Sequence, residues 1–162
     1  MKIANPGLIC AYCLTFLFFY NGVSETAQND TIQPGVWTMD YDGALKLAEK
    51  EKLPLLLNFT GSDWCGWCKK LDAEVFSKKE FTEYAEKNLV LVELDFPAKK
   101  KQSAELKEAN SKLKDKYKVS GFPTILAIDG DGKVCWTQVG YLAGGPSVFI
   151  GKLNDAKSKA EK

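Results

Sequence analysis

The sequence predicts an α/β fold with three layers, in which helices cover both faces of a central mixed sheet. Nearly continuous apolar runs at 53–59 and 89–95 are typical of strands that are buried on both sides. Amphipathic stretches separate the apolar runs, which gives the order strand, helix, strand, helix, strand, strand, helix. The Asp-Gly-Asp-Gly sequence at 129–132 marks a hairpin turn between the last two strands.

Residues 1–24 have the three regions of a secretory signal peptide in their usual order. Lys2 gives a short positive start, residues 8–20 are almost wholly apolar, and the small residues Gly22 and Ser24 precede a polar run. The apolar stretch is short for a membrane span, so an uncleaved anchor is the less favoured alternative. We expect cleavage near Ser24 and export to the periplasm, with secretion as the alternative, and no membrane contact except through this signal.

The rest of the chain has a length that suits one domain. We expect a flexible lead-in at 25–36, a folded domain at 37–157 and a charged tail at 158–162. The full chain carries 22 basic and 21 acidic side chains, and removal of residues 1–24 takes away Lys2 and no acidic residue. The mature protein is then formally neutral, which does not favour nucleic acid or anionic lipid as its main partner.

The folded domain is expected to begin with a short edge strand at 37–39 and a helix from Asp42. One face of this helix is apolar and carries Ala44, Leu45 and Ala48. The strand at 53–59 comes next, and its apolar run is continuous rather than alternating, which indicates burial on both faces.

A loop at 60–64 then leads to a helix that starts at Cys65. We expect this helix to break near Ser77 and to restart. Residues 77–80 have the form of a capping box, and Phe76 and Phe81 occupy the positions of a hydrophobic staple around it.

The later elements follow from the same patterns. We expect a strand at 89–95, a loop at 96–102, an amphipathic helix at 103–117, strands at 125–128 and 133–139, and a last helix that opens at 144–146. The apolar stripe of the helix at 103–117 consists of Leu106, Ala109, Leu113 and Tyr117.

The sequence Cys65-Gly66-Trp67-Cys68 stands where the first buried strand gives way to a helix. Two thiols at this spacing can close a small disulfide ring and reopen it, and the helix start stabilises a thiolate on the first of them. Export would place the pair where disulfides persist or must be actively reduced. Three cysteines remain after the signal peptide, which is too few for a disulfide framework in a chain this long. The pair is therefore interpreted as reactive rather than structural.

Two other classes of chemistry are alternatives to redox exchange. The chain contains no histidine, which excludes Ser–His and Cys–His mechanisms and histidine-ligated metals. A zinc knuckle needs about four ligands, and only Cys135 and carboxylates remain to complete one. Redox chemistry is therefore favoured over a metal site. For Cys135 itself, a buried structural thiol is favoured over a third redox residue.

On the sequences Trp64-Cys65-Gly66-Trp67-Cys68-Lys69 and Gly121-Phe122-Pro123-Thr124, the chain resembles the thioredoxin superfamily. The resemblance covers about residues 37–157. Within this superfamily, the chain resembles exported reductases of the DsbH type most and also resembles the soluble thioredoxin-like domain of the membrane electron conductor DsbD. This resemblance implies a thioredoxin-like fold, a cis bond before Pro123, no cofactor, disulfide-containing exported proteins as substrates, and an electron donor of the DsbD type. We expect a monomer.

The positions of the two thiols predict their roles. Cys65, at the helix start, is expected to be the exposed nucleophile that forms a mixed disulfide, and Cys68, one turn on and more buried, is expected to resolve it. The reverse sequence would oxidise a dithiol, so a dithiol oxidase or isomerase remains an alternative to the reductase. A non-catalytic metal carrier or docking module with this fold is the alternative from another class.

Further residues are expected to meet the substrate. Trp64 and Trp67 flank the thiols in the sequence, Gly66 lies between them, and Pro123 is expected to hold the Phe122 backbone beside them. The alternative for the two tryptophans is the hydrophobic core, and we expect at least one of them to face the substrate.

Two departures from thioredoxin concern the mechanism. Trp67 stands where thioredoxin has proline, and the buried aspartate of thioredoxin aligns, with an offset of one residue, with Asn58. An amide cannot accept a proton from the resolving thiol as a carboxylate does. Glu93, on the neighbouring strand, is the candidate proton acceptor, and the alternative is that it faces solvent.

Overall fold

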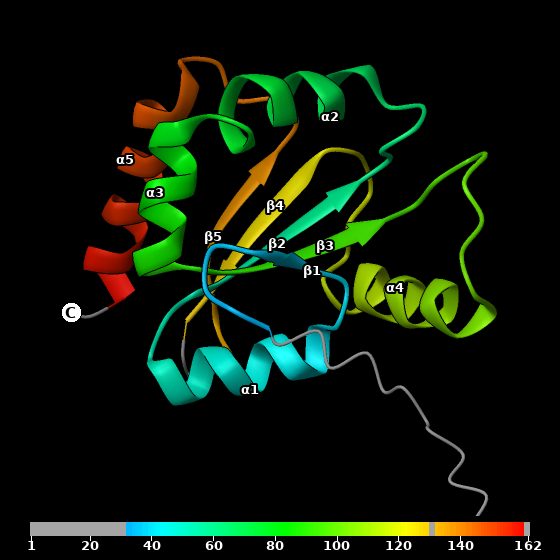
Figure 1. The fold of residues 1–162 in the computed structure, drawn as a ribbon, viewed down its shortest axis with the longest axis horizontal. Helices are drawn as coiled ribbons and strands as arrows, with labels where there is room; N and C mark the ends of the chain where they lie inside the picture. The colour runs from blue at the N-terminus through cyan, green and yellow to red at the C-terminus, as the bar shows by residue number, and fades with distance from the viewer. Residues whose placement is uncertain (1–31, 130–131, 161–162) are drawn as a thin grey trace, which may run out of the picture. The chain divides into compact units, whose positions relative to one another are not determined.

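A five-stranded mixed sheet forms the centre of the molecule, in the order β1-β3-β2-β4-β5 (Figure 1). The strands are β1 (Trp37–Thr38), β2 (Leu55–Thr60), β3 (Val90–Asp95), β4 (Thr124–Ile128) and β5 (Val134–Val139). The first three are parallel to one another, β4 is antiparallel to β2, and β5 is antiparallel to β4. This computed structural model describes residues 32–129 and 132–160. The expected signal peptide, most of the expected lead-in and the tip of the hairpin turn lie outside the described residues.

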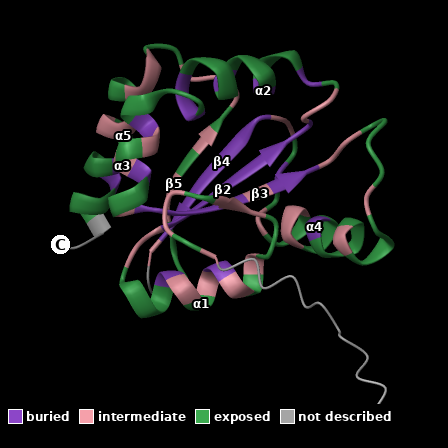
Figure 2. Ribbon diagram, in the orientation of Figure 1, coloured by how far each residue is buried: buried purple, intermediate pink, exposed green. Residues whose placement is uncertain are grey.

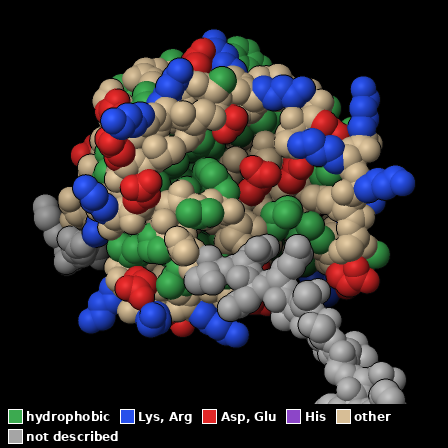
Figure 3. All heavy atoms as spheres, viewed as in Figure 1, with side chains coloured by type: hydrophobic (Ala, Val, Ile, Leu, Met, Phe, Trp, Pro, Cys, Tyr) green, Lys and Arg blue, Asp and Glu red, His purple; other side chains and the backbone are tan. Residues whose placement is uncertain are grey.

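The helices are α1 (Tyr41–Glu51), α2 (Gly66–Leu71), the π-helical turn η1 (Asp72–Phe76), α3 (Lys79–Asn88), α4 (Ala104–Lys116) and α5 (Gly145–Ala160). In the part of the chain that the structure describes, no helix is both long enough and apolar enough to cross a membrane. Lysine and acidic side chains are interspersed on the face shown in Figure 3.

Two hydrophobic cores, one on each face of the sheet, confirm the predicted three layers. Leu56 and Leu91 point into the core beneath α2, α3 and α5, whereas Leu55 and Leu57 point into the core beneath α1 and α4. All six residues of β2 are buried, which explains why its sequence is apolar without alternation (Figure 2). The central position of β2 fixes where the chain emerges toward the two cysteines.

The expected break near Ser77 is present, but the expected capping box is wrong. The backbone N–H of Ser77 donates to the carbonyl of Asp72 at 2.8 Å, a bond across five residues that closes the π-helical turn. This bond keeps Ser77 helical, so the extended N-cap conformation passes to Lys78, which has no side-chain cap. The rings of Phe76 and Phe81 do pack together, with centroids 5.0 Å apart, but with Lys78 as the N-cap these two residues no longer occupy the positions of a hydrophobic staple.

The expected apolar stripe of α4 is wrong at one position. Ala109 is exposed, and the adjacent Asn110 is buried instead, at 2% exposure. Its side-chain amide donates to the carbonyl of Asp95 at 3.0 Å. A polar residue takes the core position because it satisfies a buried carbonyl at the end of β3.

Candidate active site

Cys65 and Cys68 lie where the chain passes from β2 into α2, and they form a disulfide with their Cα atoms 5.3 Å apart. Cys65 is the N-cap of α2, and its sulfur accepts a hydrogen bond from the backbone N–H of Cys68 at 3.2 Å. The sulfur of Cys65 thus occupies the position in which a capping side chain meets the free N–H groups of a helix. Those groups and the helix dipole favour negative charge there, as a thiolate nucleophile requires.

The expectation that Cys65 is exposed and Cys68 more buried is wrong for the disulfide form. The two residues are 6% and 5% exposed, because the ring closes against the start of the helix. Exposure therefore does not distinguish the two sulfurs, whereas the hydrogen bond that the sulfur of Cys65 accepts does. Gly66, between them, is exposed, and a Cβ atom added there would meet nothing within 4 Å. The space over this part of the disulfide ring is open.

Trp64 directly precedes Cys65 and is 51% exposed. Its indole N–H donates to the carbonyl of Phe96 at 2.8 Å, and its ring meets that of Phe122 edge-on at 5.9 Å. A Cβ atom on Gly61 would lie 2.5 Å from the Trp64 ring, so only glycine leaves room for the ring in this position. In the loop before Cys65, the backbone of Gly61 therefore packs directly against the Trp64 ring.

Polar contacts bind this loop to the segment that follows β3. The carboxylate of Asp63 accepts hydrogen bonds from the backbone N–H groups of Ala98, Lys99 and Lys100, at 2.9, 2.6 and 3.0 Å. These hydrogen bonds, that of Ala98 first, lower the pKa of Asp63 to about 2. Ser62 binds the carboxylate of Asp95 through both its backbone N–H and its hydroxyl. We call residues 61–64 and 95–100 with these contacts the Trp64 side of the site.

The loop before β4 meets the Trp64 side. The Phe122–Pro123 peptide bond is cis, and the carbonyl of Pro123 accepts the backbone N–H of Gly140 at 2.8 Å. The Phe122 ring packs between Trp64 and Phe96. The backbone N–H and carbonyl of Phe122 form no hydrogen bond with the described residues, so both are available to an extended chain.

Trp67 lies between the two cysteines in the sequence, contacts a different set of residues from Trp64, and is 59% exposed. Its ring stacks on Tyr141, with centroids 5.6 Å apart and planes inclined by 30°. Tyr141 belongs to the connection between β5 and α5, and it is not among the residues that the sequence predicts to meet the substrate. No local pattern marks it, because its partner is 74 residues away. Both tryptophans are exposed, so the core alternative is wrong for each.

Asn58 and Glu93 are register partners on β2 and β3, and both face the side of the sheet that α2 covers. Asn58 is 7% exposed, and its amide oxygen has no hydrogen-bond partner among the described residues. Glu93 is partly buried rather than fully exposed to solvent. Burial, followed by the charges of Asp95 and Asp72, raises its pKa, which makes it a better proton acceptor than an ordinary glutamate. It forms no hydrogen bond with either cysteine.

Cys135 is a free thiol and takes no part in the Cys65–Cys68 disulfide. It lies on β5, is partly buried, and its thiol donates to the carbonyl of Ala127 at 3.3 Å. Burial, followed by the charge of Asp129, raises its pKa and disfavours the reactive thiolate. Across residues 32–129 and 132–160, no group of three or more Cys, Asp or Glu side chains is arranged to hold a metal ion.

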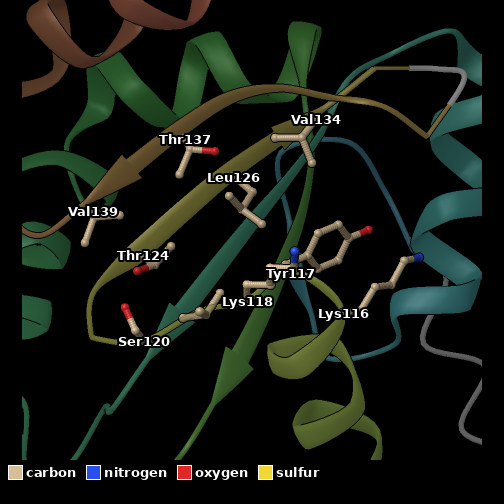
Figure 4. Close-up of a pocket in the computed structure, with 10 residues that line it drawn as sticks. Lys116, Tyr117, Lys118, Ser120, Thr124, Leu126, Val134, Thr137 and Val139 are labelled. Atoms are coloured by element: carbon tan, nitrogen blue, oxygen red, sulfur yellow. The ribbon is translucent and has the colours of Figure 1, made fainter.

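A separate hollow of about 320 Å³ lies between β4, β5 and the end of α4 (Figure 4). Its walls include Tyr117, Leu126 and Thr137, with Lys116 and Lys118 at the end of α4. None of the cysteines lines it. The hollow is therefore separate from the Cys65–Cys68 disulfide.

Comparisons with known proteins agree with this geometry. The family model described as a thioredoxin-like domain matches residues 41–157, more than half of the chain. The disulfide bond reductase DsbH of Chlamydia pneumoniae is 39% identical over 116 residues, 72% of this chain and 69% of DsbH. A solved structure of a DsbH oxidoreductase matches with a TM-score of 0.70 at 38% identity, covering 75% of this chain and 83% of that chain. The reduced C-terminal domain of Neisseria meningitidis DsbD has the same fold, with a TM-score of 0.57 at 21% identity, covering 75% of this chain and 99% of the domain.

Proposed function

Because the chain belongs to the thioredoxin-like family and is a thiol–disulfide oxidoreductase, we propose that it reduces the disulfides of proteins outside the cytoplasm. The observation that carries this proposal is the Cys65–Cys68 disulfide at the start of α2, with the sulfur of Cys65 at the N-cap. Similarity to a relative named a disulfide bond reductase supports the direction of electron flow.

The first step is attack by the Cys65 thiolate on a disulfide of the substrate. A bond forms between Cys65 and one substrate sulfur, and the other substrate sulfur leaves as a thiolate that takes up a proton. Trp64, Gly66 and Trp67 surround the reacting sulfur. An extended substrate segment hydrogen-bonds to the free backbone groups of Phe122, ahead of Pro123.

The second step is attack by Cys68 on the sulfur of Cys65. This forms the Cys65–Cys68 disulfide and releases the second substrate thiol, so two electrons pass from the protein to the substrate. Cys68 must lose its proton to attack, and Glu93 is the proposed acceptor, reached through a bridging water. A membrane donor of the DsbD type then reduces the Cys65–Cys68 disulfide for the next cycle.

We propose roles for the other parts of the chain as well. Residues 1–24 direct export and are removed near Ser24, residues 25–36 link the cleavage site to the domain, and the domain at 37–157 works as a monomer in the periplasm. N-terminal sequencing of the exported protein should find a start within a few residues of position 25.

Turnover with a protein substrate tests the proposed function. The reduced protein is mixed with a cystine-containing polypeptide, and the substrate thiols that appear are counted. Cys65→Ser should abolish turnover, whereas Cys68→Ser should accumulate the mixed disulfide with Cys65.

Equilibration with a glutathione buffer should give a reduction potential near that of thioredoxin, about −270 mV. A potential near that of a strong oxidant, about −120 mV, would make the protein an oxidase. Stoichiometric binding of a soft metal without turnover would make it a metal carrier.

The role of Glu93 has a test of its own. Glu93→Gln should slow release of the second substrate thiol on the order of a hundredfold. The raised pKa means that ionised Glu93 opposes folding near neutral pH, so the variant should melt at the same temperature as wild type or higher at pH 7. This gain in melting temperature should vanish as the pH falls below the ordinary glutamate pKa, because Glu93 is then neutral in both the folded and the unfolded protein. Glu80→Gln, at an exposed position on α3, is the matched control. Unchanged release kinetics in Glu93→Gln would remove Glu93 from the mechanism.

A further inference from the structure

Four side chains form a cluster around the Trp67 ring, separate from the residues that Trp64 contacts, and the exchange chemistry does not require them. Trp67, Lys70 and Glu74 follow one another along one face of α2 and η1, at spacings of three and four residues. Tyr141 packs on them from the connection between β5 and α5. We call these four residues the Trp67 cluster.

Each member of the Trp67 cluster contacts at least two others. The ammonium of Lys70 lies over the ring of Trp67 at 5.5 Å and over that of Tyr141 at 4.9 Å. It also lies 3.9 Å from the carboxylate of Glu74. The hydroxyl of Tyr141 donates to the same carboxylate. Tyr141 is therefore held at its ring by two neighbours and at its hydroxyl by a third.

These contacts decide what a substrate meets at this place. The charge of Lys70 is balanced by that of Glu74, and its ammonium lies over the two aromatic rings. The hydrogen bond to Glu74 raises the pKa of Tyr141, which keeps its hydroxyl neutral. Trp67 is more than half exposed even in the stack. The surface beside the disulfide is thus aromatic and without net charge.

The position of this surface gives it a role in recognition. Trp67 directly precedes Cys68 and its ring is exposed, so the side chains beside the cysteine of a bound substrate have this ring within their reach. A flat apolar side chain gains ring stacking there, whereas an acidic one would meet a lysine that is already paired.

We propose that the Trp67 cluster is a docking surface for an aromatic side chain next to the reactive cysteine of the substrate, and that Tyr141 is the positioning residue that holds Trp67 for it. This inference rests on the proposed function and deepens it, because it names a class of substrate. Stacked aromatic pairs contribute enough to change affinity about three- to tenfold, which sets the size of the expected effect.

The test compares two cystine peptides that differ only beside the cysteine, where one has Phe and the other Asp, and a small disulfide, bis(2-hydroxyethyl) disulfide. Wild type should reduce the Phe peptide with the lower KM. Tyr141→Ala should raise that KM about three- to tenfold and leave kcat, the Asp peptide and the small disulfide unchanged. Tyr141→Phe keeps the stack and should behave as wild type within about twofold. Tyr84→Ala, which removes a tyrosine that binds Asn154 on α5, is the matched control and should not change the KM values.

Other results would overturn the inference. A preference for the Asp peptide would mean that the charge of Lys70, not the ring of Trp67, meets the substrate. An equal loss of kcat for all three disulfides in Tyr141→Ala would mean that Tyr141 supports the reacting cysteines instead. Binding of matched peptides with Ser in place of Cys, followed by tryptophan fluorescence, separates this inference from the proposed function. Loss of turnover with the Phe preference retained in binding would refute only the reductase, and equal binding of the two peptides would refute the docking surface.

Discussion

The two tryptophans beside the disulfide are similarly exposed but are held in different ways. On the Trp64 side, hydrogen bonds join the loop to the backbone of residues 95–100, and the indole N–H is one of the donors. In the Trp67 cluster, ring stacking and a lysine hold the indole, and its N–H has no partner among the described residues. Hydrogen bonds fix direction and distance, whereas stacked rings can slide at small cost. We infer that the Trp64 side fixes the position of Cys65, and that Trp67, which only ring contacts hold, is less firmly fixed than Trp64.

The largest effect is expected from a side chain at Gly61. A Cβ atom there would lie 2.5 Å from the Trp64 ring, so Gly61→Ala must displace the ring and break its bond to Phe96. We expect a loss of about 1–3 kcal/mol in the free energy of unfolding, measured by urea denaturation. Gly66→Ala is the matched control, because its Cβ meets nothing within 4 Å and alanine favours the helix. The control should be neutral or stabilised by up to about 1 kcal/mol, and equal losses in the two variants would contradict this account.

The next effect is expected at Asp63, and it depends on pH. Its pKa is lowered to about 2 in the folded protein by the three backbone N–H groups, against an ordinary value of 3.8. A lowered pKa means that the ionised form stabilises the fold, fully above pH 4 and progressively less as the pH falls toward 2. Asp63→Asn should therefore melt at a lower temperature than wild type at pH 7, with the difference shrinking between pH 4 and pH 2. Asp155→Asn, at an exposed position on α5, is the matched control. A difference independent of pH would mean that the carboxylate charge is not what holds residues 98–100.

A smaller effect should separate the two indoles directly. Trp64→Phe keeps the contact with Phe122 but loses the hydrogen bond to the carbonyl of Phe96, so it should cost about 1 kcal/mol of stability. Trp67→Phe keeps a ring over Tyr141 and loses no hydrogen bond among the described residues, so its cost should stay within about 0.5 kcal/mol. Both are measured by urea denaturation of the oxidised protein. The reverse order would show that the stacked indole is the more firmly held of the two.

The same contrast explains what the sequence could predict. The cysteine pair, the strands that position it and the exposed tryptophans follow from local patterns, because burial on both faces and the start of a helix leave a signal within a few residues. The clamp on residues 98–100 by Asp63 and the stack of Tyr141 on Trp67 join segments that are 35 and 74 residues apart. Composition and periodicity specify that a residue is buried or at a helix end, but they do not specify its distant partner. Asn110 was missed for a related reason, since its burial depends on a carbonyl of β3.

The smallest effect is expected at Lys70, and it tests whether the Trp67 cluster works through its rings or its charge. Lys70→Met keeps an unbranched apolar side chain beside both rings and removes the ammonium that lies 3.9 Å from Glu74. The pair is exposed, so the loss of stability should be below about 1 kcal/mol. If the rings bind the substrate, the KM for the Phe peptide should change by less than about twofold, because the stack of Trp67 on Tyr141 remains. Lys69→Met is the matched control, because its ammonium binds the Asp63 carbonyl instead. A large rise in KM for Lys70→Met alone would show that the lysine cation, not the ring of Trp67, recognises the substrate. The stacking of Trp67 would then not distinguish its role from that of Trp64.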